Sequence, residues 1–117
     1  MGQLSTHVLD LTIGKPAARM AIDLYRVEGR QRQHLTTAIT NADGRTEEPL
    51  LSNDALIPAV YELVFHAAAY HRERGENLPD PPFLDEIVIR FGVADAAGGY
   101  HIPLLLTPYG YSTYRGS

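Results

Sequence analysis

Hydrophobic and polar residues alternate in short stretches along most of this chain, which is the period of a β-strand rather than of a helix. The first stretch, residues 3–11, places Leu4, Thr6 and Val8 on one face and Ser5, His7 and Leu9 on the other. Further strands are predicted at residues 20–25, 35–39, 60–65, 87–91, 100–106 and 109–115, with a short edge strand near 50–51. The pattern therefore favours a β-rich fold.

Turn residues separate these stretches. Asp43-Gly44 is the clearest turn, because a glycine here supplies the positive φ that tight turns need. The run from 14 to 16 and the polar run from 28 to 31 predict two more turns. Residues 66–74 form the one good helical segment, since three alanines favour a helix and Gly75 can cap its end.

About eight short strands and one helix of about two turns predict an all-β sandwich. A chain of 117 residues suits a single domain, residues 1–117. A domain of this size buries about two thirds of its unfolded surface, enough for a core without disulfides. Hydrophobic residues make up 44% and charged residues 21%, which are ordinary values for a globular protein.

Charge and composition exclude several classes. The net charge is −4 and the basic residues are scattered, so no nucleic-acid partner is expected. There are no cysteines, which excludes a disulfide framework and a thiolate nucleophile. No stretch reaches the roughly 20 apolar residues of a membrane span. The N-terminus has no basic segment before an apolar run, so we expect no membrane partner and a cytoplasmic protein.

Five histidines supply the groups that titrate near neutrality. His66 and His71 lie five positions apart on the predicted helix, so they do not share a face as a metal pair at four would. No His-Glu-x-x-His string exists, and no metal or other cofactor is expected. His34 adjoins the polar turn and is expected to face solvent. These three are expected to be structural.

His7 and His101 each lie inside a predicted strand between apolar neighbours. Taken singly, each has a plain reading as a hydrogen-bonded sheet histidine, and Arg45 reads as a solvated turn residue. The C-terminal run 111–117 is polar and aromatic, and the sequence stops directly after the predicted strand 109–115. Because chain ends usually fray, this pattern predicts a docked end whose carboxylate is a fixed charge.

These same residues carry a family likeness that runs essentially from Leu4 to Ser117. The motifs are Leu4-Ser5-Thr6-His7-Val8-Leu9-Asp10, Asp43-Gly44-Arg45, Tyr100-His101-Ile102-Pro103-Leu104-Leu105, Pro108-Tyr109-Gly110-Tyr111-Ser112-Thr113 and Tyr114-Arg115-Gly116-Ser117. In this order and spacing they resemble the hydroxyisourate hydrolases of the transthyretin-related family. The closing tetrapeptide is the most specific of the motifs.

The resemblance implies a transthyretin-like β-sandwich of two four-stranded sheets with one short helix. It also implies a homotetramer, built as a dimer of dimers, with active sites in the channel between the dimers. Strand residues that would otherwise face solvent would then be buried. His101 and Pro103 share one strand face, and Ser112 and Tyr114 share another, as a lined channel requires.

The resemblance further implies hydrolysis of 5-hydroxyisourate to 2-oxo-4-hydroxy-4-carboxy-5-ureidoimidazoline in urate degradation, without a cofactor. The family's catalytic positions fall on His7, Arg45, His101 and Ser117, and its substrate-binding positions on His7, Arg45, Ser112 and Tyr114. A neutral imidazole suits a general base, and a guanidinium suits an oxyanion. Which histidine is the base stays open, with His101 favoured; converging charges would lower the histidine pKa values.

Two other classes fit the same fold. A transthyretin-type carrier of a small aromatic ligand should lack the ionisable set His7, Arg45 and His101, and should run past Ser117. A structural or interaction domain would explain the fold but not this set of polar residues. Fold alone does not separate the three classes, whereas the site residues favour the hydrolase.

Overall fold

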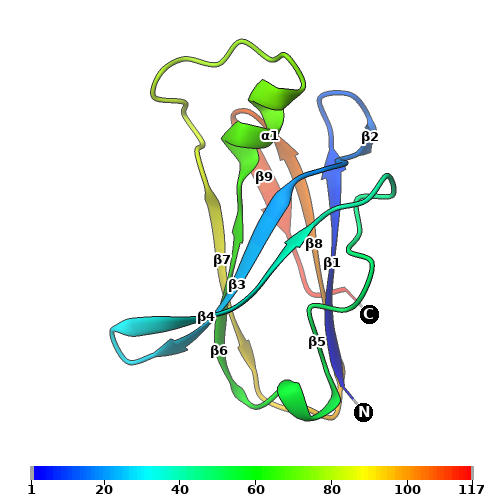
Figure 1. Ribbon diagram of the computed structural model, residues 1–117, viewed down its shortest axis with the longest axis vertical. Coiled ribbons are helices and arrows are strands. Elements are labelled where there is room, and N and C mark those ends of the chain that lie inside the picture. The colour runs from blue at the N-terminus through cyan, green and yellow to red at the C-terminus, as the bar shows by residue number, and fades with distance from the viewer. Residues whose placement is uncertain (1, 117) are drawn as a thin grey trace.

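The computed structural model describes residues 2–116, which form two β-sheets packed face to face with one helix at an end of the sandwich (Figure 1). The strands are β1 (Gln3–Asp10), β2 (Lys15–Pro16), β3 (Ala21–Glu28), β4 (Gln31–Ile39), β5 (Leu51–Ser52), β6 (Ala59–Phe65), β7 (Ile87–Val93), β8 (Gly99–Thr107) and β9 (Gly110–Thr113). The helices are the 3₁₀ turn η1 (Asn53–Ala55) and α1 (Ala67–Glu73). None of the described helices is long and apolar enough to span a membrane.

One sheet has the order β4-β3-β6-β7, and the other has β2-β1-β8-β9 with β5 also paired to β1. The strands β1 and β8 are parallel, and the other pairs are antiparallel. β2 pairs with one end of β1, at Leu9 and Asp10, and β5 with the other end, at Gln3 and Leu4. Both therefore occupy one edge position, so each sheet is four positions wide. The expected sandwich of two four-stranded sheets is confirmed, with one edge divided.

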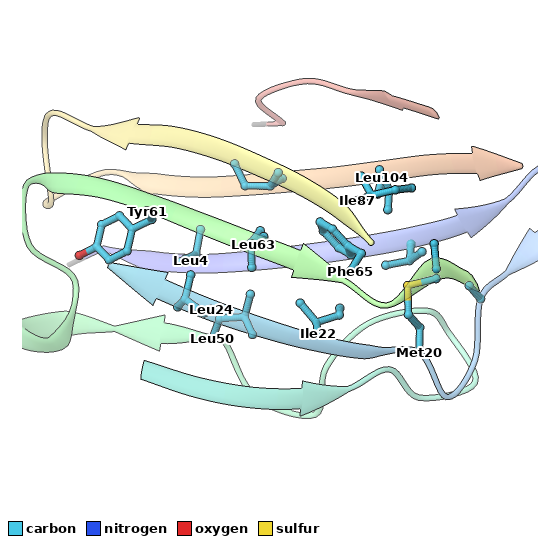
Figure 2. Packing of buried hydrophobic residues seen from close by; sticks show 14 of the residues in the cluster. Leu4, Met20, Ile22, Leu24, Leu50, Tyr61, Leu63, Phe65, Ile87 and Leu104 are labelled. Carbon is cyan, nitrogen blue, oxygen red and sulfur yellow. The ribbon is translucent and has the colours of Figure 1, made fainter. Parts of the chain in front are cut away.

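The core lies between the sheets because alternate residues of each strand point inward. In β1 the expected inward set Leu4, Thr6 and Val8 is buried. Leu63 and Phe65 of β6, on the opposite sheet, belong to the same buried cluster as Leu4 and Val8. Figure 2 shows Leu4, Leu63 and Phe65 in this cluster. Full burial of such a side chain contributes about 1.5–3 kcal/mol. The odd-numbered residues of β1 are left on the outer face, where the candidate site lies.

The last strand is shorter than the predicted stretch 109–115. β9 ends at Thr113, which pairs with Leu104 of β8. The next pair would involve Pro103, whose carbonyl already accepts the Thr113 hydroxyl at 2.7 Å. Because a proline has no backbone N–H to donate on that side, the ladder is interrupted there. Pairing resumes as a single bridge between His101 and Gly116.

Most other boundaries lie within three residues of the prediction, but β4 begins at Gln31, four residues before the predicted strand 35–39. The helix predicted over 66–74 is α1, and Gly75 after it has φ +89° as a capping glycine requires. The 28–31 loop is tighter than expected, since only residues 29 and 30 turn between β3 and β4. The turn predicted at residues 14–16 contains the short strand β2.

Candidate active site

Two strands supply one cluster on the outer face of the β1–β8 sheet. Ser5 and His7 of β1 alternate with the buried residues of that strand, so they point outward. His101 of β8 also points outward, because its neighbours Tyr100 and Ile102 are buried. In the parallel register Ser5 lies opposite His101. The sheet thus presents both strand histidines on the same outer surface.

The turn before Arg45 brings this side chain to the same surface. Gly44 has φ +75° and its amide donates to the Asn41 carbonyl at 2.9 Å. The Gly44 carbonyl accepts the Val8 amide at 2.8 Å, which fixes the turn against β1. Arg45 then forms a β-bridge with His7. The predicted Asp43-Gly44 turn is confirmed, and it occupies the divided sheet edge between β2 and β5.

The hydrogen bond of His7 defines which of its ring nitrogens carries a proton. Its Nε2 lies 2.9 Å from the carbonyl oxygen of Asp43. A carbonyl only accepts hydrogen bonds, so Nε2 is the protonated nitrogen and Nδ1 is the unprotonated one in the neutral ring. The Nε2 of His7 is therefore engaged as a donor to the backbone.

His101 is half-buried, and its Nδ1 lies 2.9 Å from the Ser5 hydroxyl oxygen. Burial lowers the pKa of His101 below its usual 6.5, and the charges of Arg45 and His7 lower that pKa further. This shift favours the neutral ring at pH 7. Its Nε2 has no hydrogen-bond partner within residues 2–116.

A shallow hollow of about 480 Å³ opens beside this cluster. The residues that line it are Gln3, Ser5, Arg45, Gly99, Tyr100 and His101. A guanidinium donor and a neutral imidazole at one hollow can bind an anionic or carbonyl-bearing molecule and accept a proton from water. This is the part of the structure best suited to hydrolytic chemistry.

The C-terminal residues approach the same surface to different extents. Gly116 donates its amide to the His101 carbonyl at 2.7 Å. Tyr114 is 60% exposed, just before this bridge. Ser112 pairs with Leu105, four residues along β8 from His101, so it lies on the same face but outside the hollow. The prediction for Ser117 and its carboxylate lies outside the described residues.

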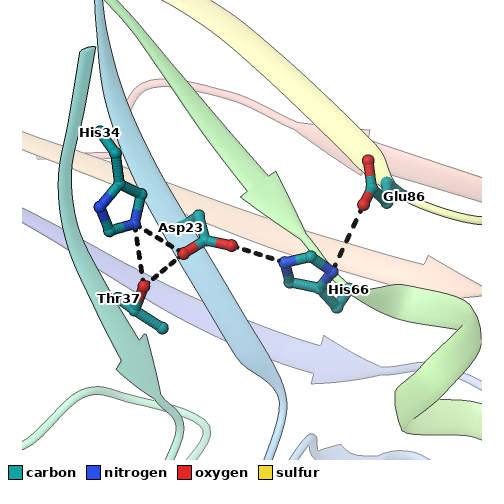
Figure 3. Close-up of polar contacts among 5 residues, drawn as sticks. All are labelled: Asp23, His34, Thr37, His66 and Glu86. Carbon is teal, nitrogen blue, oxygen red and sulfur yellow. Dashed lines mark hydrogen bonds and ion pairs between the residues drawn. The ribbon is translucent and has the colours of Figure 1, made fainter.

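A second polar cluster lies on the outer face of the other sheet (Figure 3). Asp23 of β3 accepts hydrogen bonds from His34 at 2.9 Å and from His66 at 2.7 Å, and it also contacts Thr37. The other ring nitrogen of His66 lies 3.6 Å from Glu86. His34 is exposed as expected, but it is also held by Asp23.

This second cluster has a structural role, because it connects neighbouring elements of the sheet. The hydrogen bond from Thr37 and those from the two histidines lower the pKa of Asp23 to about 2, against the opposing effect of burial. Asp23 thereby links β4 to the segment that enters α1. Within residues 2–116, no group of three or more His, Asp and Glu side chains is placed to hold a metal ion.

Sequence reasoning did not single out Ser5. It belongs to the motif around His7, but nothing local indicates that its hydroxyl meets a histidine 96 residues away. Only the parallel pairing of β1 with β8 makes this contact. The alternation of β1 already placed Ser5 on the face of His7, so the shared face was the one signal available.

A two-sheet sandwich with one short helix, carrying histidine and arginine on an outer sheet face, defines a transthyretin-like protein with a polar site. The model of the HIUase/Transthyretin family matches residues 4–116. The chain belongs to this family.

Relatives support this assignment across the whole chain. A 5-hydroxyisourate hydrolase of Pseudomonas aeruginosa is 54% identical over 117 residues, covering 100% of this chain and 93% of that protein. A 5-hydroxyisourate hydrolase 2 of Rhizobium meliloti is 55% identical over 116 residues, covering 99% of this chain and 97% of that protein.

Solved structures agree on the fold. The 5-hydroxyisourate hydrolase of Klebsiella pneumoniae superposes with a TM-score of 0.83 at 33% identity, covering 100% of both chains. Sea bream transthyretin in complex with thyroxine superposes with a TM-score of 0.87 at 24% identity, covering 97% of this chain and 94% of that one. The second likeness shows the fold alone.

Proposed function

We propose that this chain is a hydrolase that opens the six-membered ring of 5-hydroxyisourate in urate degradation. The observation that carries the proposal is the joint placement of His7, Arg45 and His101 on one sheet face. The relatives named as 5-hydroxyisourate hydrolases, at 54–55% identity over nearly the full chain, support the choice of substrate. The active unit is one domain spanning residues 1–117, and we expect it in the cytoplasm.

In the proposed mechanism His101 is the general base. Its Nε2 takes a proton from water as the water oxygen attacks the cyclic amide carbonyl. The lowered pKa of His101 supports this role, because the ring must be unprotonated at neutral pH. His7 is less suited, since it does not line the hollow, and with Nε2 donating to the Asp43 carbonyl only its Nδ1 could act as a base. General-base catalysis of this kind contributes about 10²–10⁴-fold.

Arg45 completes the chemistry of the proposed step. Its guanidinium holds the oxyanion that forms at the attacked carbonyl, where a fixed positive charge stabilises the transition state. The ring C–N bond then breaks as the proton on His101 passes to the leaving nitrogen. The new carboxylic acid releases its remaining proton to solvent, and the resulting carboxylate stays against Arg45. His7, Ser112 and Tyr114 are assigned to substrate binding, and Ser117 to the catalytic set.

The hollow beside His101 is open, which supports a further part of the proposal. We infer that two dimers face each other across this sheet and close the sites, giving a homotetramer. A site open to solvent weakens every charge interaction within it, whereas a facing dimer would exclude water. The outward Tyr114, 60% exposed in the single chain, would then be covered.

The proposal is tested by following the ultraviolet decay of freshly generated 5-hydroxyisourate with and without the protein. We expect decay well above the spontaneous rate. Decay at the spontaneous rate, together with binding of a small aromatic ligand such as thyroxine, would replace the hydrolase by a carrier function.

A further inference from the structure

Ser5 forms a side-chain hydrogen bond with the proposed base, His101. Its hydroxyl oxygen lies 2.9 Å from Nδ1 of His101. Both residues are half-buried and lie opposite each other in the β1–β8 register. Both also line the hollow that holds Arg45. The contact is therefore built into the central strand pair of the sheet and does not depend on a loop.

A hydroxyl can either donate to or accept from a ring nitrogen, and this freedom matters for a histidine that changes protonation state. When Nδ1 carries the proton and donates to Ser5, Nε2 is unprotonated and basic. When His101 is fully protonated, Nδ1 still donates to the same oxygen, so the ring need not move. The Ser5 contact thus suits a base that works through Nε2.

The backbone of Gly116 limits the ring from another side. A Cβ on Gly116 would lie 2.6 Å from Cδ2 of His101, which shows how closely the terminal segment packs against the imidazole. The Gly116 amide also bonds the His101 carbonyl. Ser5 contacts Nδ1 and Gly116 packs close to Cδ2, so both contacts favour the observed orientation of the ring, in which Nε2 is not engaged by Ser5 or Gly116.

We infer that Ser5 is a positioning residue for the reaction: its hydroxyl accepts the Nδ1 proton of His101 and so directs the basic Nε2 at the attacking water. This inference rests on the proposed function for its catalytic meaning. The hydrogen bond itself is a property of the folded chain and is measurable without substrate.

The sharpest test compares Ser5→Thr with Ser5→Val. The two replacements are branched alike and have nearly the same shape, and only threonine keeps the hydroxyl. Steady-state decay of 5-hydroxyisourate should show Ser5→Thr within about threefold of the parent kcat, and Ser5→Val slower by about tenfold or more, with KM changed little. Thermal unfolding of both variants checks that the fold is retained.

A second readout follows the ring directly. In Ser5→Val the charged form of His101 loses a hydrogen-bond acceptor, so its pKa falls below that of Ser5→Thr. Nitrogen-15 chemical shifts of His101 should show one tautomer in the parent and Ser5→Thr, and a mixture in Ser5→Val. The acid limb of the pH–rate profile should move to lower pH in the valine variant alone.

The outcomes separate the two proposals. Equal activities, tautomers and pKa values in the threonine and valine variants would overturn the role of Ser5, whatever the parent enzyme does. If the parent did not accelerate the decay, the proposed function would fail. The nitrogen-15 comparison would then still decide whether Ser5 orients His101.

Discussion

Neutral His101 owes its low pKa partly to one residue, Arg45. Burial is the larger cause, and the charge of Arg45 comes next. A histidine with a lowered pKa stays basic to a more acid pH, so the acid limb of kcat/KM should have its midpoint below 6.5. The limb lies on the acid side because activity requires the unprotonated ring.

The contribution of Arg45 to the lowered pKa of His101 can be measured directly. In Arg45→Met the pKa of His101 should rise toward 6.5, because the repelling charge is gone while burial remains. Titration of the His101 ring by proton NMR measures this change. Arg30→Met is the matched control, since Arg30 is an exposed residue in the turn between β3 and β4. An unchanged pKa in Arg45→Met would show that the guanidinium does not act on the ring.

At the scale of elements, the turn at residues 41–44 decides whether Arg45 reaches the site. Gly44→Ala should destabilise the fold by about 2 kcal/mol or more. Gly44 has φ +75°, and a Cβ there would lie 2.3 Å from the Val8 carbonyl oxygen. Urea unfolding measures the loss, and the activity of the folded fraction should fall as well.

Gly29→Ala is the control for this change. Gly29 also has a positive φ, +64°, but nothing lies within 4 Å of a Cβ placed on it. Gly29→Ala should therefore lose only the stability that the strained positive φ costs, without a steric clash of the new Cβ. Equal losses in the two variants would show that contact with Val8 has no part in fixing the turn.

The helix α1 contains a buried histidine that the proposed reaction does not use. His71 is fully buried, and neither ring nitrogen has a hydrogen-bond partner among residues 2–116. Burial lowers its pKa below 6.5, against the opposing charges of Asp10 and Glu76. Unfolding frees the ring to take up a proton, so below about pH 6.5 the unfolded state binds more protons and the folded state loses stability.

His71→Leu should remove this penalty. An apolar side chain needs no hydrogen-bond partner, so the melting temperature at pH 7 should be unchanged or higher. The expected gain in the free energy of unfolding is at most about 1 kcal/mol. The loss of stability between pH 7 and pH 5 should also be smaller than in the parent. A marked destabilisation at pH 7 would show that the His71 ring makes a favourable contact after all.

The sequence predicts elements better than it predicts which elements meet. Alternation placed Leu4 and Val8 in the core, and Asp-Gly placed the turn, because both signals are local. The early end of β9 depends on Pro103 in the neighbouring strand, and the Ser5–His101 bond depends on parallel pairing. Which strands pair, and in which register, cannot be predicted from the periodicity of one sequence. The family likeness, not the pattern, brought His7, Arg45 and His101 together as candidates.

For the whole molecule, the proposal requires that the outer face of the β1–β8 sheet be closed by another copy. Sedimentation velocity at micromolar concentration should therefore give a tetramer. Tyr114→Arg, which places a charge on that face, should shift the distribution toward dimers and lower activity in proportion. A monomer with full activity would contradict the inter-dimer site.

In the proposed mechanism His101 activates water at this surface. The most direct measurement compares the rate of 5-hydroxyisourate decay for the parent, His101→Asn and His34→Asn. His34 lies on the opposite sheet and is held by Asp23, so its variant controls for the loss of a partly exposed histidine. We expect His101→Asn to lose about 10²-fold or more of the rate and His34→Asn to stay close to the parent. Equal rates for the parent and a folded His101→Asn would contradict it.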